Sequence, residues 1–89
     1  MPIPHLKSRT EELLFEQKQL SKADADIEQG WSRLRNQQDL LFQLQSTGRD
    51  TREAEKLVQL MKQTLVEWDR HRRLIEQRIA QLENETPGA

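Results

Sequence analysis

The chain has 89 residues, of which 34% are hydrophobic, 33% charged and 4% aromatic, and its formal net charge at pH 7 is −1. This length allows one domain at most, and a chain so short and polar cannot close a large core by itself. The absence of cysteine excludes disulfides and thiolate chemistry, and the small net charge provides no overall attraction to nucleic acid or to an anionic membrane.

The first predicted helix spans residues 8–46. Residues 1–7, which include two prolines, are expected to form an extended arm. Ser8 is suited to cap the helix, with Glu11 three residues later completing a capping box. An apolar residue recurs every seven positions, beginning at Leu6 just before this helix and continuing at Leu13, Leu20, Ile27, Leu34 and Leu41. This spacing keeps one line of side chains on one face of a long helix.

A short turn is predicted over residues 47–50. Gly48 suits the left-handed backbone conformation that ends many helices, and Asp50 suits the N-cap of the next helix. The alternative for this stretch is a phosphate-binding loop. We exclude it because the stretch has a single glycine, no Gly-Lys-Ser/Thr element and no preceding strand. A connection of about four residues is common between antiparallel helices.

The second predicted helix spans residues 51–85 and fills both inward positions of its heptads. One set is Val58, Leu65, Arg72 and Ile79. The other set is Ala54, Met61, Trp68, Ile75 and Leu82. The intervals alternate between three and four residues, the spacing of knobs-into-holes packing. Residues 86–89, which include a proline and a glycine, are expected to fray.

Together these elements predict an all-α fold, a two-helix antiparallel hairpin that packs as a coiled coil. The predicted hairpin seam is Leu20, Ile27, Trp31, Leu34, Leu41, Val58, Met61, Leu65, Trp68, Ile75 and Ile79. Trp31 and Trp68 are expected to fill the core at mid-length, with Gly30 leaving room for the indole of Trp68.

Arg72 interrupts the apolar seam of the second helix. We expect its guanidinium to reach Asp24 or Glu28 on the first helix. A polar residue at a seam position tends to fix the register and the number of helices, at some cost in stability.

Several large apolar residues fall beside or away from the seam. They are Leu14, Phe15, Leu40, Phe42, Leu57, Leu60, Val66 and Leu74. A hairpin that exposes so many would associate, and the simplest closed assembly is a homodimer of hairpins that forms a four-helix bundle. The alternative is that some of them dock a different protein. The candidate partner-binding residues are Leu14, Phe15, Leu40 and Phe42.

The densest basic stretch runs from Arg70 to Arg73. The candidate phosphate contacts are Arg70, Arg72, Arg73 and Arg78. A nucleic-acid-binding face normally carries charge of one sign, whereas here Glu67, Asp69 and Glu76 are interleaved. A salt-bridged surface is therefore favoured. A protein–protein interaction or assembly module is the leading functional hypothesis, and a small nucleic-acid-associated regulatory protein is the alternative.

The sequence assembles no recognisable catalytic or metal centre. Catalysis needs convergent polar groups in a pocket that excludes water, and two helices enclose no such pocket. The Glu-x-x-His pairs of a carboxylate metal site do not occur either. We therefore predict no enzyme activity, metal, cofactor or small-molecule substrate. No stretch approaches the roughly 18 apolar residues of a membrane span, and the N-terminus lacks the apolar core of a secretory signal, so a cytoplasmic location is expected.

Residues 20–80 carry an ordered set of short features. They are Ile27 and Gly30, Arg33 and Gln37, the Gly-x-Asp-Thr turn at Gly48, Asp50 and Thr51, then Ala54, Glu55 and Leu57, Thr64 and Leu65, and the pair His71 and Arg72. This set resembles a family of small uncharacterised helical proteins of alphaproteobacteria, especially rhizobia. Trp68 departs from the family pattern, which often has a smaller or more polar residue there. The resemblance implies a bacterial source and carries no mechanism with it.

Overall fold

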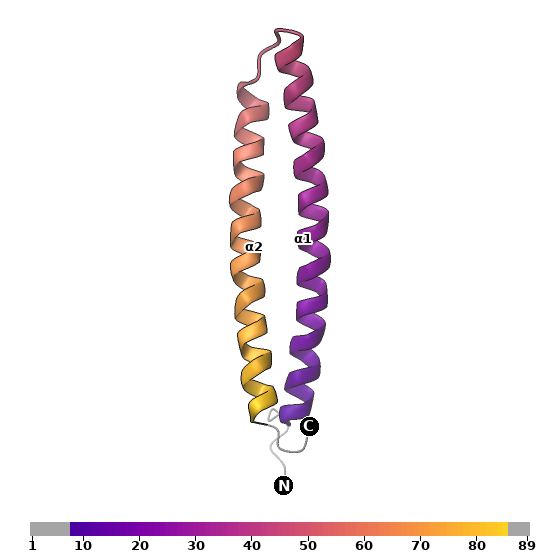
Figure 1. Ribbon diagram of the computed structural model, residues 1–89, viewed down its shortest axis with the longest axis vertical. Helices are drawn as coiled ribbons and strands as arrows, with labels where there is room; N and C mark the ends of the chain where they lie inside the picture. The colour runs from indigo at the N-terminus through magenta and orange to yellow at the C-terminus, as the bar shows by residue number, and fades with distance from the viewer. Residues whose placement is uncertain (1–7, 86–89) are drawn as a thin grey trace.

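The structure, a computed structural model, describes residues 8–85, which form two long helices joined by a turn (Figure 1). Helix α1 runs Arg9–Ser46 and helix α2 runs Arg52–Asn84. The two helices lie antiparallel and pack against each other, which confirms the predicted all-α hairpin. The arm predicted over residues 1–7 and the frayed tail predicted over residues 86–89 lie outside the described residues.

Both ends of α1 are closed by contacts that the sequence predicts. Ser8 is the N-cap, and its hydroxyl accepts a hydrogen bond from the backbone N–H of Glu11 at 3.1 Å. At the other end Gly48 has a φ of +69°, and the backbone N–H of Arg49 donates to the carbonyl of Leu44 at 2.9 Å. This left-handed closure satisfies a carbonyl that the last helical turn leaves without a partner.

The start of α2 differs from the prediction by one residue. Thr51 rather than Asp50 is the N-cap, and the Thr51 side chain caps no helical N–H. The Asp50 carboxylate nevertheless accepts a hydrogen bond from the backbone N–H of Arg52 at 3.1 Å. Asp50 therefore lies one residue before the N-cap instead of at it, and its carboxylate still binds a backbone N–H of the first turn of α2.

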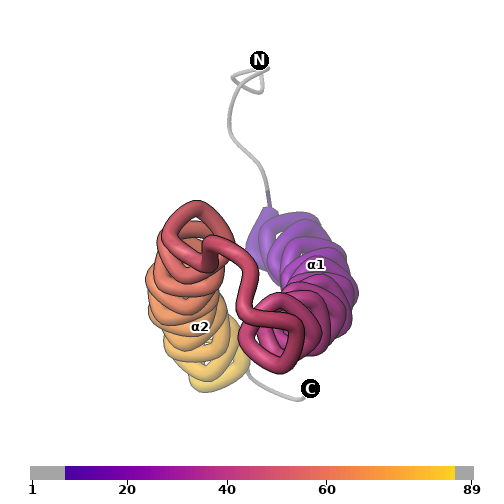
Figure 2. Tube along the Cα trace, turned by 90° about the horizontal axis from the view of Figure 1, so that it is seen from above, coloured from indigo at the N-terminus to yellow at the C-terminus, as the bar shows by residue number. Residues whose placement is uncertain are grey.

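Seen along the long axis, the two helices are inclined to one another (Figure 2). A seven-residue apolar repeat falls slightly short of two full turns of a straight α-helix. The seam therefore stays between the helices only if they wind around each other.

The core is a single narrow seam between α1 and α2. The buried apolar residues are Leu34, Ala54, Val58, Leu65, Ile75, Ile79 and Leu82. Only Leu34 comes from α1. The second line of inward positions on α1 holds Glu16, Ala23, Gly30, Gln37 and Leu44, all half-buried. Because most of these are small or polar, α1 mainly provides room for the larger side chains of α2.

Gly30 provides this room most directly. A Cβ atom at Gly30 would lie 2.8 Å from Cδ2 of Leu65 and 3.2 Å from Cζ3 of Trp68. The expectation that Gly30 leaves space for the Trp68 indole is therefore confirmed.

Trp31 is not in the core, and its prediction as a seam residue is wrong. Its side chain is 50% exposed, whereas Trp68 packs against the buried cluster around Leu34 and Leu65. Trp31 follows Gly30 by one residue, which is about 100° around the helix. Since Gly30 faces α2, Trp31 lies at the edge of the seam.

Replacing Gly30 with valine is expected to destabilise the hairpin by about 1–3 kcal/mol, because the added atoms overpack the contact with buried Leu65. This loss exceeds the few tenths of a kcal/mol by which valine is the better helix former. Ser32→Val, at an exposed position on α1, is the matched control and is expected to change stability by less than about 0.5 kcal/mol. Chemical denaturation measures both variants. Equal stabilities for the two would contradict the packing role of Gly30.

Candidate interaction surfaces

The other predicted seam residues lie at the helix interface to different depths. Those that are buried are Leu34, Val58, Leu65, Ile75 and Ile79. Those that are half-buried are Leu20, Ile27, Leu41, Met61 and Trp68. The surface available for a partner therefore has to come from side chains outside this seam.

The four candidate partner-binding residues, Leu14, Phe15, Leu40 and Phe42, are all exposed, and Phe42 is the most exposed at 68%. They do not form one continuous surface. Leu40 lines a groove beside the turn, together with residues of α2. Phe42 follows Leu40 by two residues, which is about 200° around the helix, and so points to the other side of the seam.

The first groove, which we call the turn-end groove, lies between the helices next to the turn and has a volume of about 570 Å³. Its apolar lining is Leu40, Leu44, Ala54, Leu57 and Leu60. Its charged residues, Asp50, Glu53 and Lys56, come from the turn and from α2. The α1 side of this groove thus carries no charge.

The second groove, which we call the tryptophan groove, lies nearer the middle of the hairpin and has a volume of about 620 Å³. Its apolar lining is Ile27, Trp31, Leu34, Leu65 and Val66. Its polar residues are Gln38 on α1 and Lys62, Asp69, Arg70 and Arg73 on α2. The α2 side of this groove is therefore basic on balance.

The two grooves occupy opposite broad faces of the hairpin. On α2, Leu60 and Lys62 flank the seam residue Met61, and helical geometry places them about 200° apart. Leu60 lines the turn-end groove and Lys62 lines the tryptophan groove. The heptad pattern marks these residues as lying off the seam but does not show on which side of it each one falls, so the sequence does not predict this division.

Arg72, the polar residue of the seam, contacts Asp24 on α1, which is one of the two carboxylates that the sequence predicts as its partner. The Arg72 guanidinium forms ion pairs with Asp24 on α1 and with Glu76 on its own helix. The hydrogen bond to Asp24 raises the pKa of Arg72. The pair with Asp24 fixes the register, because a slip of one heptad would leave this half-buried cation facing a different residue of α1.

The four candidate phosphate contacts all have carboxylate partners. Besides the pairs of Arg72, they are Arg70 with Glu67 at 3.8 Å, Arg73 with Asp69 at 2.7 Å, and Arg78 with Glu16 at 3.1 Å. A phosphate would have to compete with a carboxylate at each position. The basic stretch is therefore better described as a salt-bridged surface than as a phosphate-binding face.

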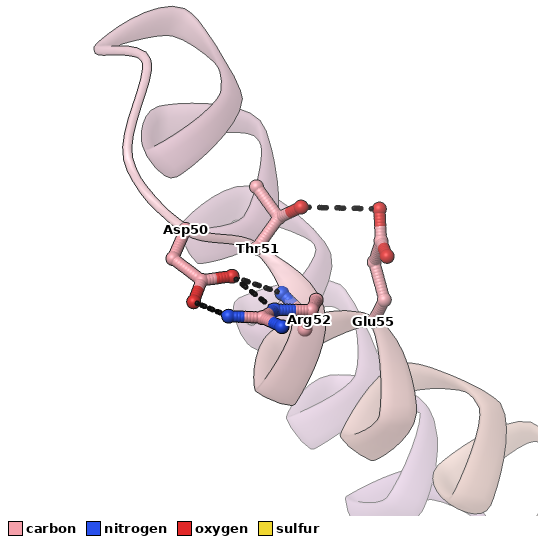
Figure 3. Close-up of polar contacts among 4 residues, drawn as sticks. All are labelled: Asp50, Thr51, Arg52 and Glu55. Atoms are coloured by element: carbon pink, nitrogen blue, oxygen red, sulfur yellow. Dashed lines mark hydrogen bonds and ion pairs between the residues drawn. The ribbon is translucent and has the colours of Figure 1, made fainter.

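Asp50 organises the junction between the turn and α2 (Figure 3). Its carboxylate accepts hydrogen bonds from the Arg52 guanidinium at 3.1 and 2.9 Å, in addition to the one from the Arg52 backbone. The side-chain hydrogen bonds, followed by the backbone one, lower the pKa of Asp50 below its ordinary value of 3.8. The hydroxyl of neighbouring Thr51 donates to Glu55 at 3.2 Å. Of these residues, Asp50 lines the turn-end groove.

Among residues 8–85, no group of three or more His, Cys, Asp or Glu side chains is placed to hold a metal ion. Within the same range, neither helix combines the length and the apolar character that crossing a bilayer requires. Comparison of the chain with models of known protein families, with curated proteins and with solved structures finds no match. The resemblance to the rhizobial family therefore stays a prediction.

Acid is expected to weaken the start of α2 through Asp50. Because the pKa of Asp50 in the folded chain lies below 3.8, its contribution to stability is complete above that value and is lost as the pH falls through the folded-state pKa. Asp50→Asn removes this dependence while keeping the shape of the side chain. Thermal melts between about pH 6 and about pH 2 should show wild type more stable than the variant at the upper end, with the difference shrinking in acid. A difference that stays constant with pH would contradict this role.

Proposed function

We propose that the protein is a non-catalytic interaction module whose partner is a second copy of the chain, so that two hairpins assemble into a four-helix bundle. The observation that carries this proposal is an imbalance of apolar side chains. Among the described residues the hairpin buries seven apolar residues and leaves nine large ones exposed. Isolated exposed leucines are ordinary, but groups of them along grooves mark association surfaces.

The layer arrangement supports the same proposal. Each amphipathic helix has to bury an apolar stripe against another element, and stable domains do so in two or three packed layers. A lone hairpin of two helices is a single layer with both broad faces in water. A second hairpin would cover one of these faces and convert the two-helix seam into a four-helix core.

The residues that line the grooves support the non-catalytic part of the proposal. Neither lining includes a serine, threonine, cysteine or histidine. The usual pairing of a nucleophile with a general base is therefore missing from both. The grooves instead combine apolar linings with charged residues, which is the composition of a protein–protein contact.

Self-association is expected to appear directly in the solution mass. Light scattering over a concentration series should approach about 21 kDa, twice the chain mass of 10.6 kDa, because a two-fold dimer is the simplest closed assembly. The thermal unfolding midpoint should rise with protein concentration, since dimerisation stabilises only the folded chain. A folded chain that remains monomeric at millimolar concentration, with a midpoint independent of concentration, would contradict the proposal.

A further inference from the structure

We infer that the tryptophan groove receives the second copy, with both turns at the same end of the bundle, so that α1 of each copy lies on α2 of the other. This inference rests on the proposed homodimer and adds the face it uses and the relative direction of the two hairpins. The occupant of the groove is thus the same groove on an identical chain, related by a two-fold axis that runs along the hairpin.

The apolar centre of this contact is formed by Trp31 and Val66. They line one groove from opposite helices, and they are 50% and 60% exposed. A two-fold axis along the hairpin places α1 of one copy against α2 of the other at the same height. Trp31 of each copy would then lie on Val66 of the other, and both indoles would leave water. Exposed tryptophans with an adjoining apolar pocket are typical anchors of protein interfaces.

The charges beside this centre are complementary in the same arrangement. On α1, Glu28 and Asp24 lie about one and two turns before Trp31, on the same side of the helix. On α2, Arg70 and Arg73 line the groove. The contact between Asp24 and Arg72 sets the relative height of the helices. Asp24 therefore lies within one residue of the level of Arg73, and Glu28 lies about two residues, or about 3 Å, from the level of Arg70. Each copy would thus bring two carboxylates close to two guanidiniums of the other copy, in addition to the ion pairs that Arg70 forms with Glu67 and Arg73 forms with Asp69 within one chain.

The opposite direction of packing loses this complementarity. If the turns lay at opposite ends, α1 would lie on α1 and α2 on α2. Glu28 is at the middle of the Arg9–Ser46 helix, so with full overlap it would face Glu28 of the second copy. The Arg70–Arg73 stretch, close to the middle of α2, would likewise face itself. Like charges at close range disfavour a contact, which selects the arrangement with both turns together.

The turn-end groove is the weaker candidate for the second copy. Its charged residues come from the turn and from α2, and the α1 side supplies only Gln37, Leu40 and Leu44. A second copy packed there would find no charge on the facing α1 lining to pair with Asp50 or Glu53. The α1 lining of the tryptophan groove is uncharged as well, but Asp24 and Glu28 lie on α1 just beyond it, within two turns of Trp31.

The available area is sufficient for a stable dimer. The 38 residues of α1 extend about 57 Å, and two helices side by side are about 20 Å wide, which gives a face of about 1,100 Å². A standard specific interface buries about 800 Å² on each partner. One broad face of the hairpin therefore exceeds what a specific contact needs.

A matched pair of substitutions on α2 tests which face is used. Val66 and Leu60 are 60% and 59% exposed, but they line the tryptophan groove and the turn-end groove respectively. Val66→Lys is expected to weaken dimerisation at least 100-fold by light scattering, because it places a charge at the centre of the contact, whereas Leu60→Lys should change it less than about threefold. The reverse result would overturn the assignment of the face.

Label distances test the direction. The chain has no cysteine, so Arg49→Cys in the exposed turn provides a single site for a spin label. With both turns together, the two labels should lie within about 30 Å, and with the turns apart they should lie about 57 Å from each other, the length of α1. Light scattering on the same sample distinguishes a failure of the proposed homodimer from a failure of the inferred direction alone. A monomer would overturn the proposed homodimer together with this inference, and a dimer with distant labels would overturn the inference alone.

Charge substitutions test the pairing itself. Arg70→Glu and Glu28→Arg are each expected to raise the dimer Kd at least tenfold, and the double variant should restore it within about threefold. Lys18→Glu, which changes the same charge on an exposed part of α1 outside both groove linings, should leave Kd unchanged. Single variants that dimerise like wild type, or a double variant no better than the singles, would overturn the pairing.

One further variant is expected to tighten the dimer. Arg35 lies one turn after Trp31 on α1, and in the inferred arrangement it is level with Lys62 of the second copy, which is a like-charge contact. Arg35→Glu should therefore lower the dimer Kd several-fold. With the turns at opposite ends Arg35 would not meet Lys62, so an unchanged or higher Kd would overturn the inferred direction.

Discussion

Two helices that lie side by side can each cover only one stripe of the other, and the rest of this structure follows from that limit. The seam buries seven apolar residues, six of them on α2, because α1 offers glycine, alanine, glutamine and glutamate at many of its inward positions. The space at Gly30 lets the large side chains of Leu65 and Trp68 lie between the helices. Everything apolar outside this stripe remains in contact with water unless another chain covers it.

The polar position within the seam has a different role from the apolar ones. Arg72 is held between Asp24 and Glu76, with its side chain 35% exposed, so its charge keeps access to water and to two carboxylates. Such a partly solvated ion pair adds little net stability, because the cost of desolvation offsets the attraction. It does make a shifted register unfavourable, since only one alignment brings Asp24 opposite Arg72. The apolar seam supplies most of the stability of the hairpin, and Arg72 selects its alignment.

Features set by local chemistry could be predicted from the sequence, and those set by the exact rotation of a helix could not. The Ser8 cap, the left-handed Gly48 and the seven-residue repeat depend on neighbours along the chain, and the structure contains all three. The division of the surface into two grooves depends on which side of the seam each residue falls. A shift of one residue rotates a side chain by about 100°, so a pattern of threes and fours leaves edge positions ambiguous.

Trp31 is an example of an edge position that the heptad pattern leaves ambiguous. Gly30 and Trp31 are adjacent, and either could have faced α2, but Trp68 fills the level of Gly30 and Trp31 lies at the edge. In a lone hairpin an edge tryptophan leaves half of a large apolar ring in water. In a four-helix bundle the edge of one two-helix seam is the inner surface of the next layer, because each helix then contacts two neighbours instead of one. A heptad position that is wrong for the hairpin seam would therefore suit the four-helix bundle that we propose.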